Sequence, residues 1–162
     1  MITHRIPVHD DIGQALVELA LVLPMFILLI VGGAEVGRLA YADIEISNAA
    51  RAGVAYAMQS HAYAADNAGI AAAAKQDAPN IPGLVVDNPA ILTCYCETSA
   101  GVTTAFASCA KDVANTTTCP SPSVIVEYVQ VNTSATIDTA FHFPGIPNTL
   151  TLRGKAVMRV EF

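Results

Sequence analysis

The side chains that could carry out acid–base or nucleophilic chemistry are few and scattered. The four histidines are His4, His9, His61 and His142. The sequence contains no G-x-S-x-G nucleophile elbow, no phosphate-binding P-loop, no G-x-G-x-x-G motif and no H-E-x-x-H zinc motif. The sequence therefore predicts a protein that is not an enzyme and that needs no cofactor.

The cysteines are the reactive residues that do cluster. They lie at Cys94, Cys96, Cys109 and Cys119, all in the polar second half of the chain. The cysteines follow an apolar stretch at residues 15–36 that could span a membrane, and an even number of cysteines beyond such a span is typical of disulfides formed in an oxidising compartment. A zinc site and free thiols are the alternatives. The C-x-C spacing departs from the usual zinc spacing and no histidine lies nearby, so we predict disulfides and no metal site.

The number of possible disulfide pairings among these cysteines can be reduced. We expect Cys94 and Cys96 to point to opposite faces of a strand, which would prevent a bond between them. Two pairings with Cys109 and Cys119 then remain. Of these we favour the nested one, Cys96–Cys109 with Cys94–Cys119.

The composition restricts the class of protein. Apolar residues make up 53% of the 162 residues, charged residues only 14%, and the formal charge is −6. A disordered chain would carry more charge and fewer apolar groups. A nucleic-acid-binding module would usually be basic, so we expect no nucleic-acid partner.

The apolar residues are concentrated near the start of the chain. Residues 19–34 carry no charge, and residues 15–36 form an apolar stretch broken only by Glu18 and Glu35. As a helix these 22 residues would be about 33 Å long, enough to cross a bilayer core of ~30 Å. A retained membrane helix is the favoured interpretation. A cleaved signal peptide and a buried core helix are the alternatives.

Several residues inside this stretch have distinct physical properties. Pro24 removes a backbone donor, which membrane helices tolerate. Gly33 and Gly37 form a GxxxG spacing that would let another helix approach closely, or occur together by chance. Glu18 would be costly in lipid unless it lies at the interface or has a partner.

Charged residues near the end of the stretch could form ion pairs. Glu35 and Arg38 are three residues apart, close enough for an ion pair on one helix face. Arg38 could instead extend to the lipid headgroups. Arg51 would either form a salt bridge with another protein chain or face water.

Hydrophobic periodicity predicts the elements beyond the span. Leu39, Ile46, Ala50, Gly53 and Ala57 form one helical stripe, which Asp43 interrupts. We therefore predict one helix over residues 15–58, a break over 60–67 and a second helix over 68–77. Strands are predicted over 91–97, 124–132, 135–143 and 150–162, with a turn at 144–148. The predicted fold is α+β, with the long N-terminal helix packed on a small antiparallel sheet.

The N-terminal third resembles the TadE/TadG-like pseudopilins of tight-adherence (Tad) type IV pili. The matching residues are Gly13 followed by QALVE, the span with Pro24, then EVGR at 35–38 and NAAR at 48–51. The FHFP sequence at 141–144 and the last strand are also similar to this family. The resemblance implies a structural pilus subunit with a pilin-like fold.

The resemblance also implies how the N-terminus is processed. Residues 1–13 would be a leader, cut between Gly13 and Gln14 by a prepilin peptidase. Glu18 would then be the fifth residue of the mature chain. Its carboxylate could pair with the freed α-amine of another subunit, so that each charge offsets the desolvation of the other.

These interpretations give four expected regions. They are a leader (1–13), a transmembrane helix (14–36), an exoplasmic continuation of the helix (37–59) and an α+β exoplasmic domain (60–162). The expected location is the bacterial inner membrane or an extracellular pilus. The expected partners are other pilin subunits, the peptidase, the assembly platform and lipid. An uncleaved single-pass binding protein and a secreted enzyme with a removed signal peptide are the alternative functions.

Overall fold

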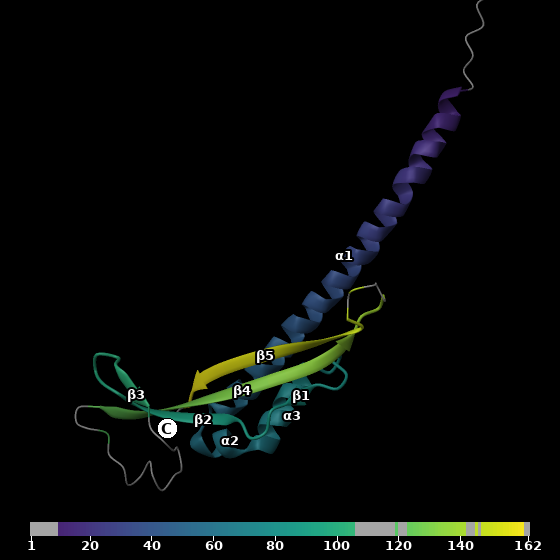
Figure 1. Cartoon of the computed structure of the whole chain (residues 1–162). Helices are drawn as coiled ribbons and strands as arrows, with labels where there is room; N and C mark the ends of the chain where they lie inside the picture. Colours follow the sequence, from purple (N-terminus) through teal and green to yellow (C-terminus); the bar gives the residue numbers. More distant parts are fainter. Residues whose placement is uncertain (1–9, 106–118, 120–122, 142–144, 146, 161–162) are drawn as a thin grey trace, which may run out of the picture. The chain divides into compact units, whose positions relative to one another are not determined.

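A computed structural model of the chain describes residues 10–105, 119, 123–141, 145 and 147–160 (Figure 1). It contains α1 (Asp10–Ala57), α2 (His61–Ala65), α3 (Asn67–Asp77), β1 (Val85–Val86), β2 (Ile91–Glu97), β3 (Thr103–Ala105), β4 (Val124–Asp138) and β5 (Thr149–Arg159). The chain divides into two compact units, residues 1–39 and 40–162, which are described separately. The predicted α+β fold, with a long helix and an antiparallel sheet, is confirmed.

The first unit contains the apolar part of α1. The helix begins at Asp10, five residues before the predicted start, and continues through Pro24. Proline lacks a backbone N–H, so the helix forgoes one hydrogen bond at this position. Its large apolar side chains from Leu16 to Ile30 are all exposed within this unit, with exposed fractions of 45–72%.

The second unit begins with the remainder of α1, which packs on the sheet. The predicted stripe is buried at Ile46, Ala50, Gly53 and Ala57, whereas Asp43 is exposed. The apolar core contains Ala50, Val54, Ala57, Ala64 and Ile70 from the helices, and Val129, Val131, Ala156 and Val160 from the β4 and β5 region. Burial of these side chains holds the helix against the sheet.

Strand β4 is the centre of the antiparallel sheet. It pairs with β5 from Tyr128 to Asp138, and its other edge pairs first with β2 and then with β1. Short β3 pairs with the outer side of β2. Strand β2 has the predicted bounds. The prediction of two strands at 124–132 and 135–143 was wrong, because one strand continues through the polar residues 133–134 as far as Asp138.

A break does separate the two predicted helices, but it is not the continuous break predicted at 60–67, because that segment contains the short helix α2. The Ser60 hydroxyl caps this helix by accepting a 3.4 Å hydrogen bond from the Tyr63 N–H. Asp66 then caps α3 by accepting a 3.0 Å bond from the Gly69 N–H. Helix α3 is rich in alanine, which favours helix, and it ends at Asp77, close before Pro79.

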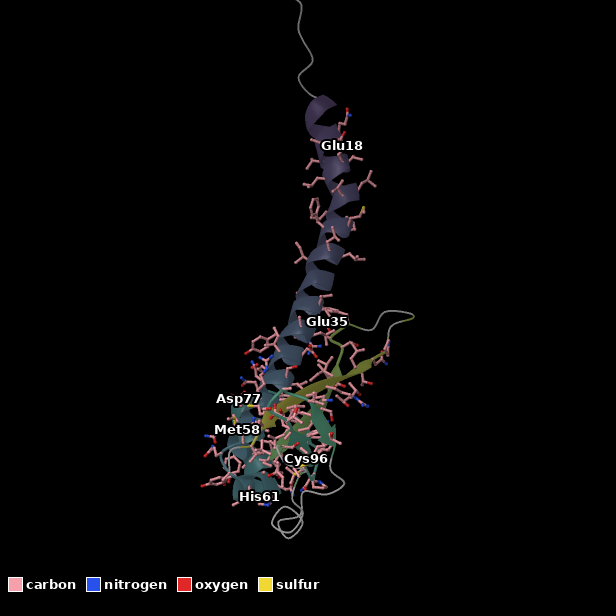
Figure 2. All side chains as sticks on the ribbon, turned by 90° about the vertical axis from the view of Figure 1, so that its left-hand side faces the viewer. Glu18, Glu35, Met58, His61, Asp77 and Cys96 are labelled. Carbon is pink, nitrogen blue, oxygen red and sulfur yellow. A yellow bond between two sulfur atoms is a disulfide. The ribbon has the colours of Figure 1, made fainter. Side chains whose placement is uncertain are left out.

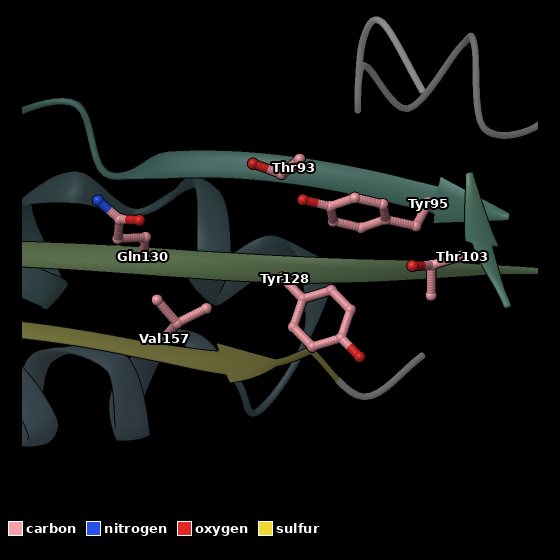
Figure 3. A pocket seen from close by; sticks show the side chains of 6 residues that line it. All are labelled: Thr93, Tyr95, Thr103, Tyr128, Gln130 and Val157. Carbon is pink, nitrogen blue, oxygen red and sulfur yellow. The ribbon is translucent and has the colours of Figure 1, made fainter. Parts of the chain in front are cut away.

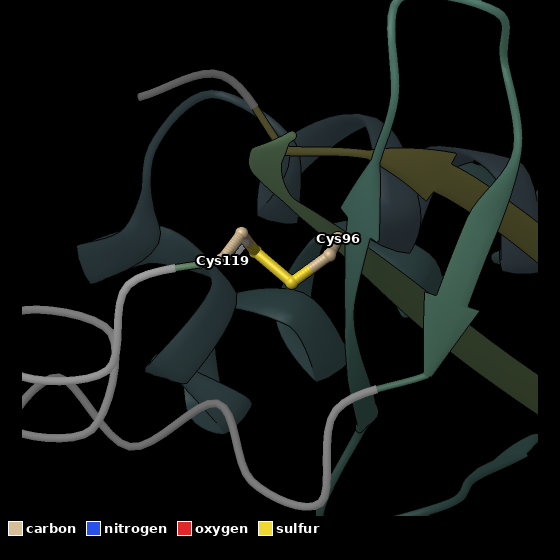
Figure 4. Close-up of a disulfide and its surroundings, with 2 residues drawn as sticks. All are labelled: Cys96 and Cys119. Carbon is tan, nitrogen blue, oxygen red and sulfur yellow. A yellow bond between two sulfur atoms is a disulfide. The ribbon is translucent and has the colours of Figure 1, made fainter. Parts of the chain in front are cut away.

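A disulfide joins Cys96 of β2 to Cys119 (Figure 4). The expectation of a disulfide is confirmed, but the nested pairing was wrong. Cys94 is also disulfide-bonded, and Cys109 lies outside the described residues. The expectation of opposite faces was wrong too. Residues two apart in a strand share a face, and Cys94 and Cys96 are both buried.

The Cys96–Cys119 disulfide spans 23 residues of sequence. Closing a loop of that length lowers the entropy of the unfolded chain, which stabilises the fold by roughly 3.4 kcal/mol in the chain-entropy model.

Candidate functional site

The apolar half of α1 is a surface of the described chain that needs a partner. Figure 2 shows side chains around this part of the helix, from Glu18 to Glu35. Among the described residues, α1 is the one helix long and apolar enough to cross a membrane. An apolar surface that continues around a helix needs lipid or other helices to cover it. This segment is therefore the candidate functional site.

The predicted cleavage point lies inside the helix. Gly13 and Gln14 are both within α1 and both exposed. A β-carbon added at Gly13 would meet no atom within 4 Å. A side chain at this position would therefore meet no other described part of the chain.

Glu18 lies one helical turn after this junction. Its Oε1 accepts a 3.3 Å hydrogen bond from Gln14 Nε2, the i,i+4 neighbour. The Glu18 side chain is exposed among exposed leucines and valines. A single amide contact does not neutralise a carboxylate, so in lipid this group would still require a cation or a proton.

The two glycines of the GxxxG spacing present open backbone. Neither Gly33 nor Gly37 would bring an added β-carbon within 4 Å of another atom. Because residues four apart share a helix face, the pair forms a small-residue patch on the helix surface. A neighbouring helix could approach the backbone closely at this patch.

The two predicted ion-pair candidates differ in the structure. Arg38 Nη2 lies 2.8 Å from Glu35 Oε1, and Arg38 Nε lies 3.2 Å from Glu35 Oε2, so the pair is bidentate. Arg51 is exposed and donates a 3.4 Å bond to Asn48 Oδ1. Arg51 forms no ion pair with a described residue.

The second half of α1 is fixed to the sheet by close backbone contact. Thr133 Oγ1 of β4 donates a 2.7 Å hydrogen bond to the Ile46 carbonyl oxygen. Gly154 of β5 lies opposite Thr133 in the sheet. A β-carbon on Gly154 would lie 2.5 Å from that same carbonyl oxygen. Glycine is therefore required where the helix crosses β5.

The sequence did not indicate a hydrogen-bonded pair between α2 and β4. His61 Nδ1 lies 2.8 Å from Glu127 Oε2, and the Glu127 side chain is 1% exposed. Its other oxygen, Oε1, has no hydrogen-bond partner among the described residues. His61, which looked like a loop residue, thus holds a carboxylate inside the domain. No local sequence pattern marks this pair, because its members are 66 residues apart.

Asp66 links the end of α1 to α3. Besides the Gly69 N–H, it accepts a 2.8 Å hydrogen bond from the Tyr56 hydroxyl. The Gly69 N–H and the Tyr56 hydroxyl favour the carboxylate form and lower the pKa of Asp66. Figure 2 labels Met58 just after α1, His61 at the start of α2 and Asp77 at the end of α3.

Residues 13–55 match the family model of TadE-like proteins. The match covers the apolar segment and most of the part of α1 that packs on the sheet. No curated protein and no solved structure matches the chain.

Proposed function

On the premise that residues 13–55 form a TadE-like domain, which indicates a Tad pilus-associated protein, we propose that this chain is a structural pseudopilin. It is inserted by one N-terminal helix and joins or primes a filament through that helix. The role is structural and not catalytic.

The observation that carries this proposal is the exposed apolar surface of α1. Its side chains from Leu16 to Ile30 are exposed in the first unit. Lipid covers such a helix before assembly, and the same surface can be covered by neighbouring helices afterwards. The TadE-like match falls on this segment and supports the assignment.

Glu18 gives the proposed assembly its register. Cleavage after Gly13 would free an α-amine at Gln14, one turn before the Glu18 carboxylate. In a bundle of apolar helices the amine of one subunit pairs with Glu18 of the next, because neither charge is stable alone in lipid. An unpaired carboxylate would oppose packing at any other stagger.

The partners and location follow from this mechanism. The partners are other pilin subunits, a prepilin peptidase that removes residues 1–13, the assembly platform and lipid. The helix anchors the chain in the inner membrane, with the disulfide-bonded domain on the exoplasmic side or in the pilus. Disulfide formation between Cys96 and Cys119 supports an oxidising compartment.

The experiment that tests this function compares two charge-removing variants, Glu18→Gln and Glu35→Gln, for membrane insertion and pilus assembly. Glu35 is paired with Arg38 on its own helix, so it is the matched control. We expect both variants to insert and only Glu18→Gln to lose assembly. Normal piliation in Glu18→Gln would contradict the proposed pairing.

A further inference from the structure

The face of the sheet turned away from the core carries a continuous row of polar and aromatic side chains. Thr93 and Tyr95 of β2 share this face with Tyr128 and Gln130 of β4, and Val157 of β5 lies beside them (Figure 3). With Thr103 of β3 they line a cavity of about 310 Å³. The helices lie behind the sheet in that view.

A second cavity lies farther along the same face. It has a volume of about 410 Å³ and is lined by Asp87, Asn132, Thr133, Ser134, Arg153, Gly154 and Lys155. Asn132 and Ser134 alternate with Gln130 along β4, and their partners across β5 are Lys155 and Arg153. All four side chains therefore point to the same side as the first cavity.

A hydrogen bond connects the two cavities. Gln130 Nε2 donates a 2.9 Å bond to Asn132 Oδ1, and Asn132 Nδ2 in turn donates a 3.3 Å bond to Asp87 Oδ2. The row from Tyr128 to Ser134 covers six residue steps of an extended strand, about 20 Å. Such a length suits an extended ligand better than a single small molecule.

The charges on this face are unusual for the chain. The protein is acidic, yet three of its eight strong cations alternate along β5, namely Arg153, Lys155 and Arg159. Arg159 is 3.4 Å from Glu97 and is therefore paired. Neither Arg153 nor Lys155 forms an ion pair with a described residue. On this face these two cations can therefore pair with an anionic ligand, and they share the second cavity with the Asp87 carboxylate.

The aromatic end offers a different kind of contact. The Tyr95 and Tyr128 rings meet edge to face with centroids 5.7 Å apart, and both residues are half-buried. Each ring keeps part of its surface open to solvent. Half-exposed tyrosine rings offer an apolar body for a ligand together with a hydroxyl group for hydrogen bonding.

We propose that this sheet face binds an acidic polysaccharide, a chain of sugar units carrying carboxylates. Its carboxylates would pair with Arg153 and Lys155. Its hydroxyls would exchange hydrogen bonds with Gln130, Asn132 and Ser134, whose amide and hydroxyl groups both donate and accept.

The weakly polar faces of the sugar rings would contact Tyr95 and Tyr128. An acidic peptide would satisfy the two cations but would supply neither the rings nor the dense hydroxyl groups that the rest of the row fits. This site lies entirely within residues 87–157, and its existence does not depend on the proposed assembly role of α1.

Calorimetric titration of the full-length protein in detergent micelles tests this proposal. The probes are an oligogalacturonate, a neutral malto-oligosaccharide of equal length and an oligoglutamate. We expect the oligogalacturonate to bind with an affinity that falls as salt is added, and the other two to bind at least about tenfold more weakly.

Matched variants locate the binding. Lys155→Gln and Tyr95→Leu should each weaken oligogalacturonate binding about tenfold. Lys75→Gln removes one exposed charge on α3 and should have no effect. Thermal unfolding confirms that each variant is folded.

Four results would overturn the proposal. They are no binding of oligogalacturonate, equal binding of oligoglutamate, equal binding of the neutral sugar, or equal weakening by Lys75→Gln. Equal binding of oligoglutamate would instead assign the face to an acidic peptide.

Discussion

Thr133 of β4 donates its hydroxyl proton to the carbonyl oxygen of Ile46 in α1, at 2.7 Å and buried from solvent. This bond joins the long helix to the central strand at the position where Gly154 leaves room for the helix backbone. It sets the depth at which the second half of α1 lies on the sheet.

Removing this bond should destabilise the second unit. Thr133→Val keeps the shape but loses the donor, and we expect a loss of about 1 kcal/mol in the free energy of unfolding. Gly154→Ala should cost more, about 1–3 kcal/mol, because its β-carbon would lie 2.5 Å from the Ile46 oxygen. Thr136→Val removes an exposed hydroxyl contact with Thr151 from the same strand and is the control in thermal or urea unfolding. If Gly154→Ala unfolded like the control, the close crossing would be wrong.

Removing His61 alone should destabilise the second unit more than removing His61 and the Glu127 charge together. His61→Ala leaves a carboxylate that is 1% exposed without its partner, and we expect a loss of about 2–3 kcal/mol. Adding Glu127→Gln to that variant should recover part of the loss, because a neutral amide costs less to bury than an unpaired charge. Urea unfolding of the unaltered protein, His61→Ala, Glu127→Gln and the double variant measures the coupling free energy between the two residues. Equal stability of His61→Ala and the unaltered protein would show that the buried pair contributes nothing.

The elements that were predicted correctly are those that residues close together in the sequence determine. Strand β2 was predicted at its observed bounds from its β-branched and apolar residues, and the Ala50 stripe from its helical period. The two strands predicted at 124–132 and 135–143 left a gap at the polar residues 133–134. The Thr133 hydroxyl is satisfied by Ile46, 87 residues away in the chain, which no local pattern reveals.

The candidate site likewise combines features that are visible in the local sequence with features that depend on the fold. The apolar segment, Glu18 and the glycine pair are local features and could be found in the sequence. The disulfide partner of Cys96 depends on where the chain returns after β3. The cavities on the open sheet face depend on strand register. Neither the disulfide partner nor the cavities could therefore be predicted from the sequence alone.

Asp66 should give the second unit an acid-dependent stability. Its pKa is lowered below its ordinary value of 3.8, first by the Gly69 N–H and then by the Tyr56 hydroxyl. The charged form is therefore favoured by folding, and its contribution is present above the ordinary pKa and is lost as pH falls through the lowered value.

We expect Asp66→Ala to lower the melting temperature at pH 7, and the difference from the unaltered protein to shrink as the pH falls below about 4. Asp77→Ala, at the other end of α3, controls for the loss of a carboxylate. A melting difference that stayed constant with pH would rule out this role for Asp66.

The glycine pair should matter for association and not for folding of the chain itself. Added β-carbons at Gly33 and Gly37 meet nothing within 4 Å, so Gly33→Leu with Gly37→Leu should leave the melting temperature unchanged. If neighbouring helices pack at this patch, the bulky pair should reduce crosslinking between subunits in the membrane and reduce pilus number. Val36→Leu, on the same segment and already exposed, is the control. Normal assembly of the double variant would place the helix contact elsewhere.

The central claim is that α1 enters a pilus assembly after the leader is removed. Intact-mass measurement of the native protein, purified from membranes and from sheared pili, tests it most directly. We expect a mature chain that begins at Gln14 in both fractions. A chain that retains Met1, as an uncleaved anchor would, or one that begins near Glu35, as a secreted protein would, would contradict the account.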